Sequence, residues 1–504
     1  MSPKQPFLNR THELERLQRR WDSGEAQIFT LWGRRRVGKS ALLLRFAEDK
    51  RHVYFEATSG TRSDQLTDFS ERLARATGRA QLSAGGWREA LDAVADWARE
   101  GPVLLVLDEF QHIAREQRDI GSTINVWWRE RGEELPIFLV LCGSEVGFFE
   151  REVAGYSATT YGRRSGQLRL RPFIPEDVAL FLPRWSPEQR IAAYAVFGSM
   201  PYYLAQIRPE QDLAENILNL ILMSDGLLHE EARLLLDQEL TDAAGYFSVL
   251  RAIAAGQTRV SQIATRTGVR GGAMRVSQML DVLQRMWLVQ RIVPVTVTNP
   301  ERSRQTRYRI ADPYLRFWFR FVLPSHDRLI DPDGARRHLQ RQVLPQLDDF
   351  VSAPAFEEVC QSWLRRDTNA AATGRWWGKV RETRGKALQS IDRELDAVAI
   401  DDEGRVIAVG SCKWTAGPLP YAEKEKLEAL ALHIAPEGPS PELYFFARRG
   451  FAPRLVEAAK RDRHLHLLTA DRLVTPGADS TSTCPGAGSP DTLVNKLIMP
   501  RALD

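Results

Sequence analysis

The segment QIFTLWGRRRVGKSALLLRF, residues 27–46, constrains the fold of this chain more than any other. A short apolar run leads into Gly33-x-x-x-x-Gly38-Lys39-Ser40, and apolar residues at helical spacing follow. The order of strand, glycine-rich loop and helix is typical of a loop whose backbone N–H groups surround a phosphate, because larger side chains at the glycines would block its approach. The pattern therefore predicts a nucleotide site at the carboxyl end of a buried strand.

The loop residues have different expected roles. Lys39 is expected to reach the β- and γ-phosphates of a nucleotide, and the hydroxyl of Ser40 is expected to hold Mg²⁺. The N–H groups that open the following helix favour anions. The remaining residues expected to bind the nucleotide are Arg34, Arg35, Arg36, Val37 and Ala41.

A second motif supports the first. VLLVLDEF, residues 103–110, begins with five apolar residues, which suits a strand buried on both faces of a parallel sheet. Asp108 at its end is expected to hold Mg²⁺ through water, and Glu109 to polarise the attacking water. A third apolar run, 135–142, is followed by Ser144, which either senses the γ-phosphate or belongs to an ordinary turn at a strand end.

The chain of 504 residues is too long for one core, so several domains are expected. Apolar strands alternate with helical patterns up to residue 175, which predicts an α/β fold with a parallel sheet. The expected strands are 27–32, 52–57, 103–107 and 135–142. Residues 176–240 have helical patterns only and are expected to form a helical lid beside the nucleotide site.

The composition excludes some classes of protein. No apolar run reaches 18 residues, so no membrane-spanning helix is expected. The first ten residues contain no apolar signal core, and the four cysteines lack CxxC spacing. A cytoplasmic protein without a zinc or disulfide framework is expected.

The sequence pattern of residues 241–322 differs from that of the preceding helical segment. Helical patterns at 243–255, 259–265 and 273–286 precede two apparent strands joined by NPERSRQ, which predicts a winged helix. Residues 243–310 contain eleven arginines and two acidic residues, a net charge of +9, which indicates a polyanionic partner such as DNA. The alternative is a winged helix that only packs between domains. The arginines expected to contact DNA are Arg270, Arg275 and Arg304.

A linker helix is expected over 323–350, a second α/β domain over 351–475 and a disordered tail over 476–504. Within ELDAVAIDDEGRVIAVGSCKW, folding about the turn at 401–404 places Asp396 opposite Ser411, with Lys413 on the same face. An aspartate, a second acid and a lysine on one face form a metal-dependent phosphodiesterase site. Ser411 stands where the second acid is expected.

Other carboxylates near this hairpin are candidates to replace the missing acid. They are Glu357, its neighbour Glu358, and Glu394, which shares a strand face with Asp396. The alternative is an ordinary hairpin with a solvated aspartate and lysine.

Several further motifs complete a resemblance to a known family. They are FLNRTHELERL (7–17), LVLDEF (105–110), LCGSEVGFFE (141–150), YGRRSGQLRLRPF (161–173), GSMPYYL (198–204), YRIADPYLRFWFRFV (308–322) and GRWWGK (374–379). With the loop at 33–40, they resemble archaeal-type P-loop ATPases of the AAA+/STAND group that carry a winged helix and a C-terminal PD-(D/E)xK nuclease-like domain.

This resemblance implies ATP and Mg²⁺ as cofactors, DNA as a partner and a possible homo-oligomer. It implies that Asn9 and Arg10 lie near the adenine and that Arg163 or Arg164 acts as an arginine finger or sensor, although a surface turn is the simpler interpretation. The family's nuclease motif has Glu-x-Lys where this chain has Ser411-Cys412-Lys413, so weak or absent cleavage is expected.

Two functional hypotheses remain open from the sequence. The first is an ATPase that couples its nucleotide state to DNA binding, with a degenerate nuclease-like domain. The second is an alternative to this ATPase and has two forms. One is a STAND-type signalling switch whose C-terminal domain binds a partner, and the other is an active ATP-regulated DNA endonuclease.

Overall fold

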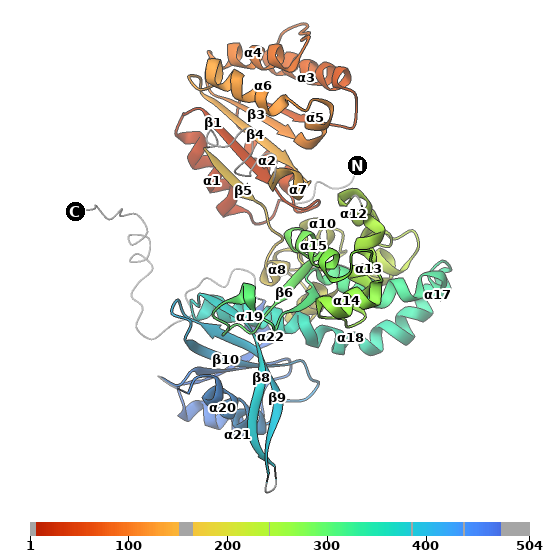
Figure 1. The fold of residues 1–504 in the computed structure, drawn as a ribbon, viewed down its shortest axis with the longest axis vertical. Helices are drawn as coiled ribbons and strands as arrows, with labels where there is room; N and C mark the ends of the chain where they lie inside the picture. Colours follow the sequence, from red (N-terminus) through yellow and green to blue (C-terminus); the bar gives the residue numbers. More distant parts are fainter. Residues whose placement is uncertain (1–6, 151–164, 241, 385–386, 437–438, 475–504) are drawn as a thin grey trace, which may run out of the picture.

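A five-stranded parallel sheet of order β2-β3-β4-β1-β5 forms the upper tier of the molecule in Figure 1. The computed structural model describes residues 7–150, 165–240, 242–384, 387–436 and 439–474. The strands are β1 (Gln27–Trp32), β2 (His52–Glu56), β3 (Val103–Asp108), β4 (Ile137–Gly143) and β5 (Gly166–Arg169). Every residue of β1, β3 and β4 is buried, which explains their continuous apolar sequences.

Helices cover both faces of this sheet. Side chains of α1 and α2 pack with Phe29 and Leu31 of β1, whereas α3, α4 and α6 pack on the opposite face with Ile28. The helices of this tier are α1 (Thr11–Asp22), α2 (Lys39–Ala47), α3 (Arg62–Thr77), α4 (Trp87–Ala98), α5 (Phe110–Glu116), α6 (Ile120–Trp127) and α7 (Val146–Phe148), with a π-helical turn at Trp128–Gly132. All the strands are parallel, so the segments that follow β1, β3 and β4 meet at one edge.

Helices form most of the middle tier (Figure 1). Between residues 176 and 240, the part expected to be a helical lid, the described residues contain no strand. The helices are α8 (Val178–Phe181), α9 (Pro187–Phe197), α10 (Pro201–Leu204), α11 (Leu213–Ile217) and α12 (Glu231–Glu239), with short turns at Pro175–Asp177 and Leu218–Leu222.

Three helices and a small antiparallel sheet follow directly, and we call residues 243–310 the basic unit. Its elements are α13 (Ala243–Ala254), α14 (Val260–Thr267), α15 (Gly272–Arg285), β6 (Val289–Ile292) and β7 (Arg307–Ile310), with a turn at Pro300–Arg302. They occupy the positions that the sequence pattern predicts for three helices and two strands.

Further helices lead from the basic unit to the lower tier. The segment 323–350, expected to be one linker helix, contains Leu323–Arg328, α17 (Pro332–His338), Leu339–Val343 and α18 (Leu344–Phe350). It is preceded by α16 (Pro313–Phe317), which continues through Trp318–Val322, and followed by Val351–Phe356. No helix in the described part of the chain is long and apolar enough to cross a membrane.

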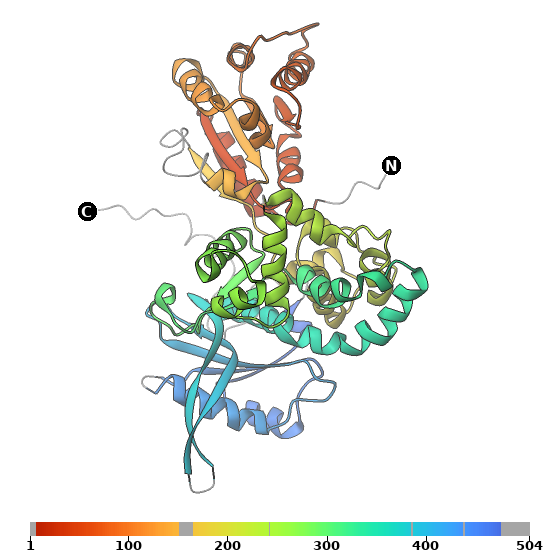
Figure 2. The same cartoon turned by 45° about the vertical axis from the view of Figure 1, so that its right-hand side comes forward.

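A mixed five-stranded sheet of order β12-β11-β10-β9-β8 forms the lower tier. The strands β8 and β9 form a long antiparallel hairpin that projects from this tier in both views (Figures 1 and 2), whereas β10, β11 and β12 run parallel. The strands are β8 (Ala372–Arg384), β9 (Ala387–Ile400), β10 (Val406–Lys413), β11 (Glu442–Ala447) and β12 (Leu465–Thr469).

Two pairs of helices cover this second sheet. Side chains of α19 and α22 join the core of the middle tier on one face, and those of α20 and α21 pack on the other. The helices are α19 (Glu357–Asp367), α20 (Ala422–Ile434), α21 (Pro453–Arg461) and α22 (Ala470–Leu473). The chain therefore has an α/β parallel-sheet domain and a second sheet domain near its C-terminal end.

Candidate nucleotide site and hairpin cluster

The glycine-rich loop turns tightly between β1 and α2. Gly38 has a φ of +93°, in the left-handed region that favours glycine. A Cβ at Gly33 would lie 2.4 Å from the carbonyl oxygen of Leu170, so that position also needs a glycine. The ammonium of Lys39 is buried and donates to the carbonyls of Gly33 at 3.0 Å and Arg34 at 3.3 Å. The Lys39 side chain therefore lies folded over the loop whose bound phosphates it is expected to contact.

Ser40 and Asp108 meet beside this loop, as expected for a Mg²⁺ pair. The Ser40 hydroxyl donates to Oδ2 of Asp108 at 2.7 Å, and the hydroxyl of Tyr54 donates to the same oxygen. The other carboxylate oxygen of Asp108 accepts the backbone N–H of Glu109 at 2.9 Å. A carboxylate and a hydroxyl in contact offer the oxygen ligands that Mg²⁺ prefers, so these residues fit the ion.

Ser144, which follows β4, and Gln111, on α5, hold the carboxylate of Glu109. Its Oε2 accepts the Ser144 hydroxyl at 2.9 Å, the Ser144 backbone N–H at 3.3 Å, and a hydrogen bond from the Gln111 amide. Ser144 therefore contacts the expected base directly. Tyr54 and Gln111 were not predicted from the sequence; Tyr54 lies in the middle of β2, which runs parallel to β3.

The three arginines of the loop all contact residues outside the sheet domain. Arg34 forms a fully buried ion pair with Asp312, Arg36 lies 2.8 Å from Oε2 of Glu231, and Arg35 donates to the Gln238 side chain. Burial disfavours the charged form of Arg34, but the Asp312 carboxylate outweighs it and raises the pKa of the guanidinium above its ordinary value. The loop is thus connected to α12 and to the residue that precedes α16.

Glu239, at the end of α12, contacts the loop itself. Its Oε1 accepts the backbone N–H of Arg35 at 3.3 Å. Burial raises the pKa of the Glu239 carboxyl, although the charges of Arg34, Lys39 and Arg35 act in the opposite direction. An anionic side chain therefore occupies part of a loop whose N–H groups and lysine suit phosphate. Nothing in the local sequence indicates this contact.

Arg10 lies behind the same loop. Its guanidinium donates to the carbonyls of Val37 at 3.1 Å and Arg171 at 2.7 Å, and it stacks on the ring of Phe173. Asn9 accepts the Arg10 backbone N–H at 2.8 Å, and both residues have positive φ. A contact of Asn9 and Arg10 with adenine stays a prediction. The expected arginine fingers Arg163 and Arg164 lie outside the described residues.

In the lower tier, Asp396 and Lys413 come together as the hairpin register predicts. The strands pair Gly410 with Ala397, so the next step places Ser411 opposite Asp396. The Lys413 ammonium lies 2.8 Å from Oδ2 of Asp396, which also accepts the Cys412 backbone N–H at 3.0 Å. Burial lowers the pKa of Lys413, but the charge and the hydrogen bond of Asp396, together with the charge of Glu423, raise it above its ordinary value.

Glu357 is the carboxylate that joins this pair. It is buried on α19, and burial together with the nearby charge of Asp396 raises its pKa to about 7, against the opposing effect of Arg375. Ser411 is buried on the same strand as Lys413. We call Glu357, Asp396, Ser411 and Lys413 the hairpin cluster.

The two other candidate acids point elsewhere. Glu358 pairs with Arg316 at 2.7 Å and Arg309 at 3.0 Å, and so connects α19 to the middle tier. Glu394 pairs with Arg375 and Arg307, each at 2.8 Å. Glu357 therefore remains as the partner of Asp396.

The arginines expected to contact DNA differ in their surroundings. Arg270 and Arg304 are exposed, and the described part of the chain offers them no ion pair. Arg275 is half-buried and lies 3.6 Å from Asp242. Met274, beside it at the start of α15, is 76% exposed. The opposite end of α15 contacts the upper tier, where Arg285 lies 3.5 Å from Glu150.

Comparison with known families gives a match that includes the upper tier. A family described as an ATPase domain predominantly from Archaea matches residues 7–207. These residues, from α1 to α10, are therefore similar to such an ATPase domain. A second family, described as archaeal and bacterial proteins of unknown function, matches residues 318–428.

Individual relatives agree with this assignment. An uncharacterized protein of Methanocaldococcus jannaschii, MJECL04, is 23% identical over 420 residues, which are 81% of this chain and 87% of the relative. An uncharacterized ATP-binding protein of the same organism, MJ0423, is 49% identical over 45 residues, which are 9% of this chain and 76% of the relative.

Solved structures resemble the chain more loosely. The Walker-type ATPase PABY2304 of Pyrococcus abyssi has a TM-score of 0.48 and 20% identity, covering 63% of this chain and 97% of its own. The Aeropyrum pernix ORC2 protein in ADPNP and ADP complexes has a TM-score of 0.42 and 16% identity, covering 68% and 97%.

Proposed function

We propose that this protein binds and hydrolyses ATP at the loop of residues 33–40 and that its nucleotide state controls DNA binding by the basic unit, which we interpret as a winged helix. The single observation that carries this proposal is that the loop contacts residues at both ends of the basic unit. Glu239 ends α12, directly before α13, and Asp312 follows β7 by two residues. The loop is therefore connected to the residues that flank the basic unit on both sides.

The chemistry of hydrolysis follows from the residues around the loop. Lys39 leaves the carbonyls that it now binds and pairs with the phosphates, as a charge-assisted contact. Ser40 and Asp108 hold Mg²⁺, which when bound offsets the phosphate charge. Glu109, held by Ser144, orients the attacking water and accepts its proton.

Glu239 provides the coupling in this scheme. Its carboxylate accepts a loop N–H and lies near Lys39, so it competes with phosphate for the same groups. Two anions do not share such a site without strong repulsion. ATP binding therefore displaces the end of α12, and α13 begins four residues later.

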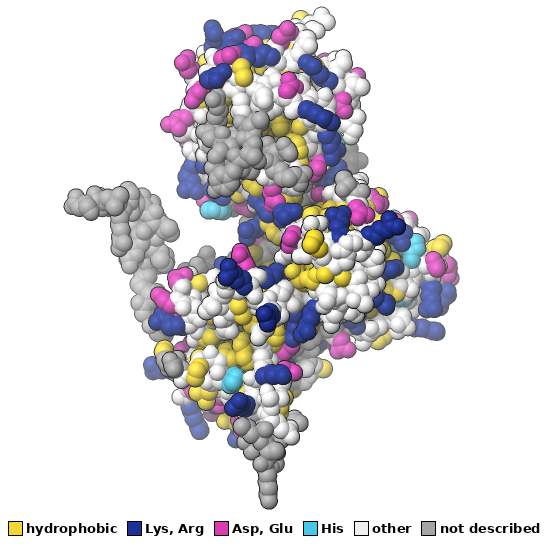
Figure 3. Space-filling model, viewed as in Figure 1, with side chains coloured by type: hydrophobic (Ala, Val, Ile, Leu, Met, Phe, Trp, Pro, Cys, Tyr) yellow, Lys and Arg dark blue, Asp and Glu magenta, His cyan; other side chains and the backbone are white. Residues whose placement is uncertain are grey.

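The exposed end of α15 is the proposed DNA surface. The N-terminal residues of a recognition helix contact base edges, and here Arg270 and Met274 lie exposed at that end. Arg304, in the segment between β6 and β7, extends the surface toward phosphates. On the face drawn in Figure 3, Lys and Arg side chains are scattered over the middle and lower tiers rather than gathered in one patch.

The test is DNA binding by the full-length protein in defined nucleotide states. Fluorescence anisotropy with a labelled duplex should give different affinities without nucleotide, with ADP and with a non-hydrolysable ATP analogue, and each should weaken steeply with salt. Lys39→Ala should show one affinity in all three states. Equal affinities in the wild type, with nucleotide binding confirmed separately, would contradict the coupling.

For the lower tier, we propose a nuclease-like fold with little or no cleavage. Asp396 and Glu357 supply two carboxylates, but Ser411 is a neutral and weak Mg²⁺ ligand. Asp396 and its partner Lys413 are both present, and the site that they form is suited to binding a phosphate backbone. Nicking of plasmid DNA with Mg²⁺ or Mn²⁺, with and without ATP, tests this assignment.

One observation favours the second candidate, a STAND-type switch. The Arg34–Asp312 pair is completely buried and spans the loop and α16, which suits slow exchange between closed and open states. Slow turnover with nucleotide retained through gel filtration would support the switch. Fast, DNA-stimulated turnover would support the ATPase. In either case, Arg163 or Arg164, supplied in cis or by a neighbouring copy, is the proposed arginine finger.

A further inference from the structure

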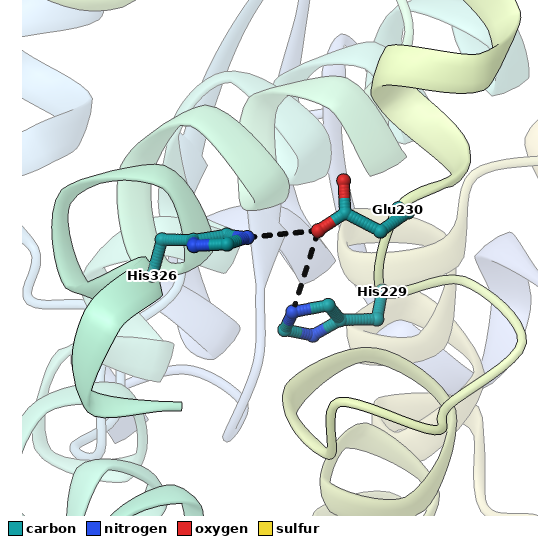
Figure 4. A group of neighbouring side chains, drawn as sticks. All are labelled: His229, Glu230 and His326. Atoms are coloured by element: carbon teal, nitrogen blue, oxygen red, sulfur yellow. Dashed lines mark hydrogen bonds and ion pairs between the residues drawn. The ribbon is translucent and has the colours of Figure 1, made fainter. Parts of the chain in front are cut away.

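A histidine–glutamate–histidine cluster lies in the middle tier and contains none of the residues of the two sites described above (Figure 4). His229 and Glu230 come directly before α12, and His326 comes from the short helix Leu323–Arg328. One ligand atom from each residue lies within 4.8 Å of the others. Nε2 of His326 is 2.8 Å from Oε1 of Glu230, and Nε2 of His229 is 3.7 Å from the same oxygen. The three side chains thus converge on one point.

His229 is held in the orientation of a metal ligand. Its Nδ1 lies 3.0 Å from the carbonyl oxygen of Ile221. A carbonyl only accepts hydrogen bonds, so Nδ1 carries the proton and Nε2 presents its lone pair to the cluster. The indole N–H of Trp318 also fixes the His229 backbone carbonyl at 2.7 Å. A backbone carbonyl behind the ring is a common support for ligating histidines.

The spacing suits a small tetrahedral ion. With metal–ligand distances of about 2.0–2.2 Å, two ligand atoms of a tetrahedral site lie about 3.3 Å apart. The two distances to Oε1 of Glu230, 2.8 and 3.7 Å, lie on either side of this value. The two imidazole nitrogens lie within 4.8 Å of one another, so side-chain shifts toward the ion would bring all three ligand atoms to this spacing.

We propose that His229, Glu230 and His326 bind a divalent cation of the zinc class. Two imidazole nitrogens and one carboxylate oxygen form a donor set that Zn²⁺ favours, with a fourth position left for water. Glu230 and His326 are partly exposed, so that position faces solvent, whereas His229 is buried. Arg233 lies 3.7 Å from the other oxygen, Oε2, and leaves Oε1 to the ion.

The ion would fasten the start of α12 to the helix Leu323–Arg328. These segments are about a hundred residues apart in the chain, and they meet here through the His326–Glu230 pair and through the rings of His229 and His326, whose centroids lie 5.5 Å apart. Binding to the folded state alone stabilises that state in proportion to the logarithm of the ion concentration. Zn²⁺ should therefore raise the melting temperature of the protein.

The test is Zn²⁺ binding to full-length protein previously treated with a chelator, measured by competition with a chromophoric chelator. We expect one site in the wild type and an affinity at least about tenfold weaker in His326→Gln, since even indirect supports of a ligand contribute that much. His464→Gln is the matched control, because His464 and His466 bind opposite oxygens of Glu442 at 2.7 Å and so do not converge.

The thermal shift provides the second measurement. Zn²⁺ should stabilise the wild type and His464→Gln but not His326→Gln or His229→Gln. His229 is buried, so the result for His229→Gln is interpreted only if the circular dichroism spectrum of this variant matches that of the wild type. If it does not, the result for His326→Gln, at a partly exposed position, tests the proposal. Equal Zn²⁺ affinity in the wild type and His326→Gln, or an equal loss in His464→Gln, would show that the cluster is only an ion pair.

Discussion

Replacing Glu239 with glutamine should tighten ATP binding by the full-length protein. The carboxylate accepts the Arg35 backbone N–H at 3.3 Å and lies within the field of Lys39 and Arg34. ATP must displace it, so part of the phosphate binding energy is spent on breaking this contact. Glutamine keeps the shape of the side chain and removes its charge.

The size of the effect follows from that contact. A hydrogen bond to a charged group contributes about 1.5–3 kcal/mol, and this one is long and partly exposed, so about 1–2 kcal/mol is expected. At 1.4 kcal/mol for each factor of ten, the ATP dissociation constant should fall by about 5- to 30-fold. Asp237→Asn on the exposed side of the same helix is the matched control and should leave the affinity unchanged.

Titration calorimetry with Mg²⁺ and a non-hydrolysable ATP analogue measures both variants. Lys39→Ala defines the baseline without the central phosphate contact. If Glu239→Gln binds the analogue as weakly as the wild type while Asp237→Asn is normal, Glu239 does not compete with phosphate and the coupling through α12 is wrong.

The pH dependence of the same measurement gives an independent check. Burial raises the pKa of Glu239 above its usual value of 4.5. Below the raised pKa the carboxyl is neutral and resembles glutamine, so the wild type and Glu239→Gln should bind alike in acid. As pH rises through that pKa, the wild type should bind progressively more weakly than the variant, because the competing charge appears. Titration of ATP itself affects both proteins equally.

Three further predictions concern the other sites. Glu109→Gln should keep nucleotide binding and lower the turnover rate by about 10²–10⁴-fold, the usual contribution of a general base; turnover at the wild-type rate would exclude this role. Ser411→Glu should raise metal-dependent nicking in a plasmid assay, whereas strong wild-type cleavage abolished by Asp396→Ala would show that another acid already completes the site. Charge reversal at Arg270, Arg275 and Arg304 should weaken DNA binding to many sequences alike and reduce its salt dependence in anisotropy assays. Unchanged binding would mean that the basic unit only packs between domains.

The central strands and the hairpin could be predicted because their signals are local. β1, β3 and β4 are buried on both faces, and this burial requires the continuous apolar runs that the sequence displays. The turn at 401–404 pairs Ile400 with Val406, and a bulge between Val406 and Ala408 then shifts the register by one residue. Ala397 therefore pairs with Gly410, and Asp396 and Lys413 meet as expected. In contrast, β5 is a four-residue edge strand, GQLR, with too few apolar residues to stand out.

The partners of the loop could not be predicted because the contacts join distant segments. Glu239 and Asp312 lie 204 and 278 residues from the arginines that they meet, and no periodic pattern records such a contact. The sequence could not distinguish Glu357 from Glu358 as the partner of Asp396 for a similar reason. Adjacent helical residues point about 100° apart, and only packing of α19 between two tiers decides which one faces Asp396.

The three loop arginines explain why the two ends of the basic unit should respond differently to ATP. Arg34 and Asp312 are both fully buried, and breaking such a pair by removing one partner costs about 3–5 kcal/mol, so this contact is expected to persist when ATP binds. Glu239 is more exposed and competes directly with phosphate. In the proposed scheme, the Asp312 end is therefore expected to stay in place while ATP displaces the end of α12.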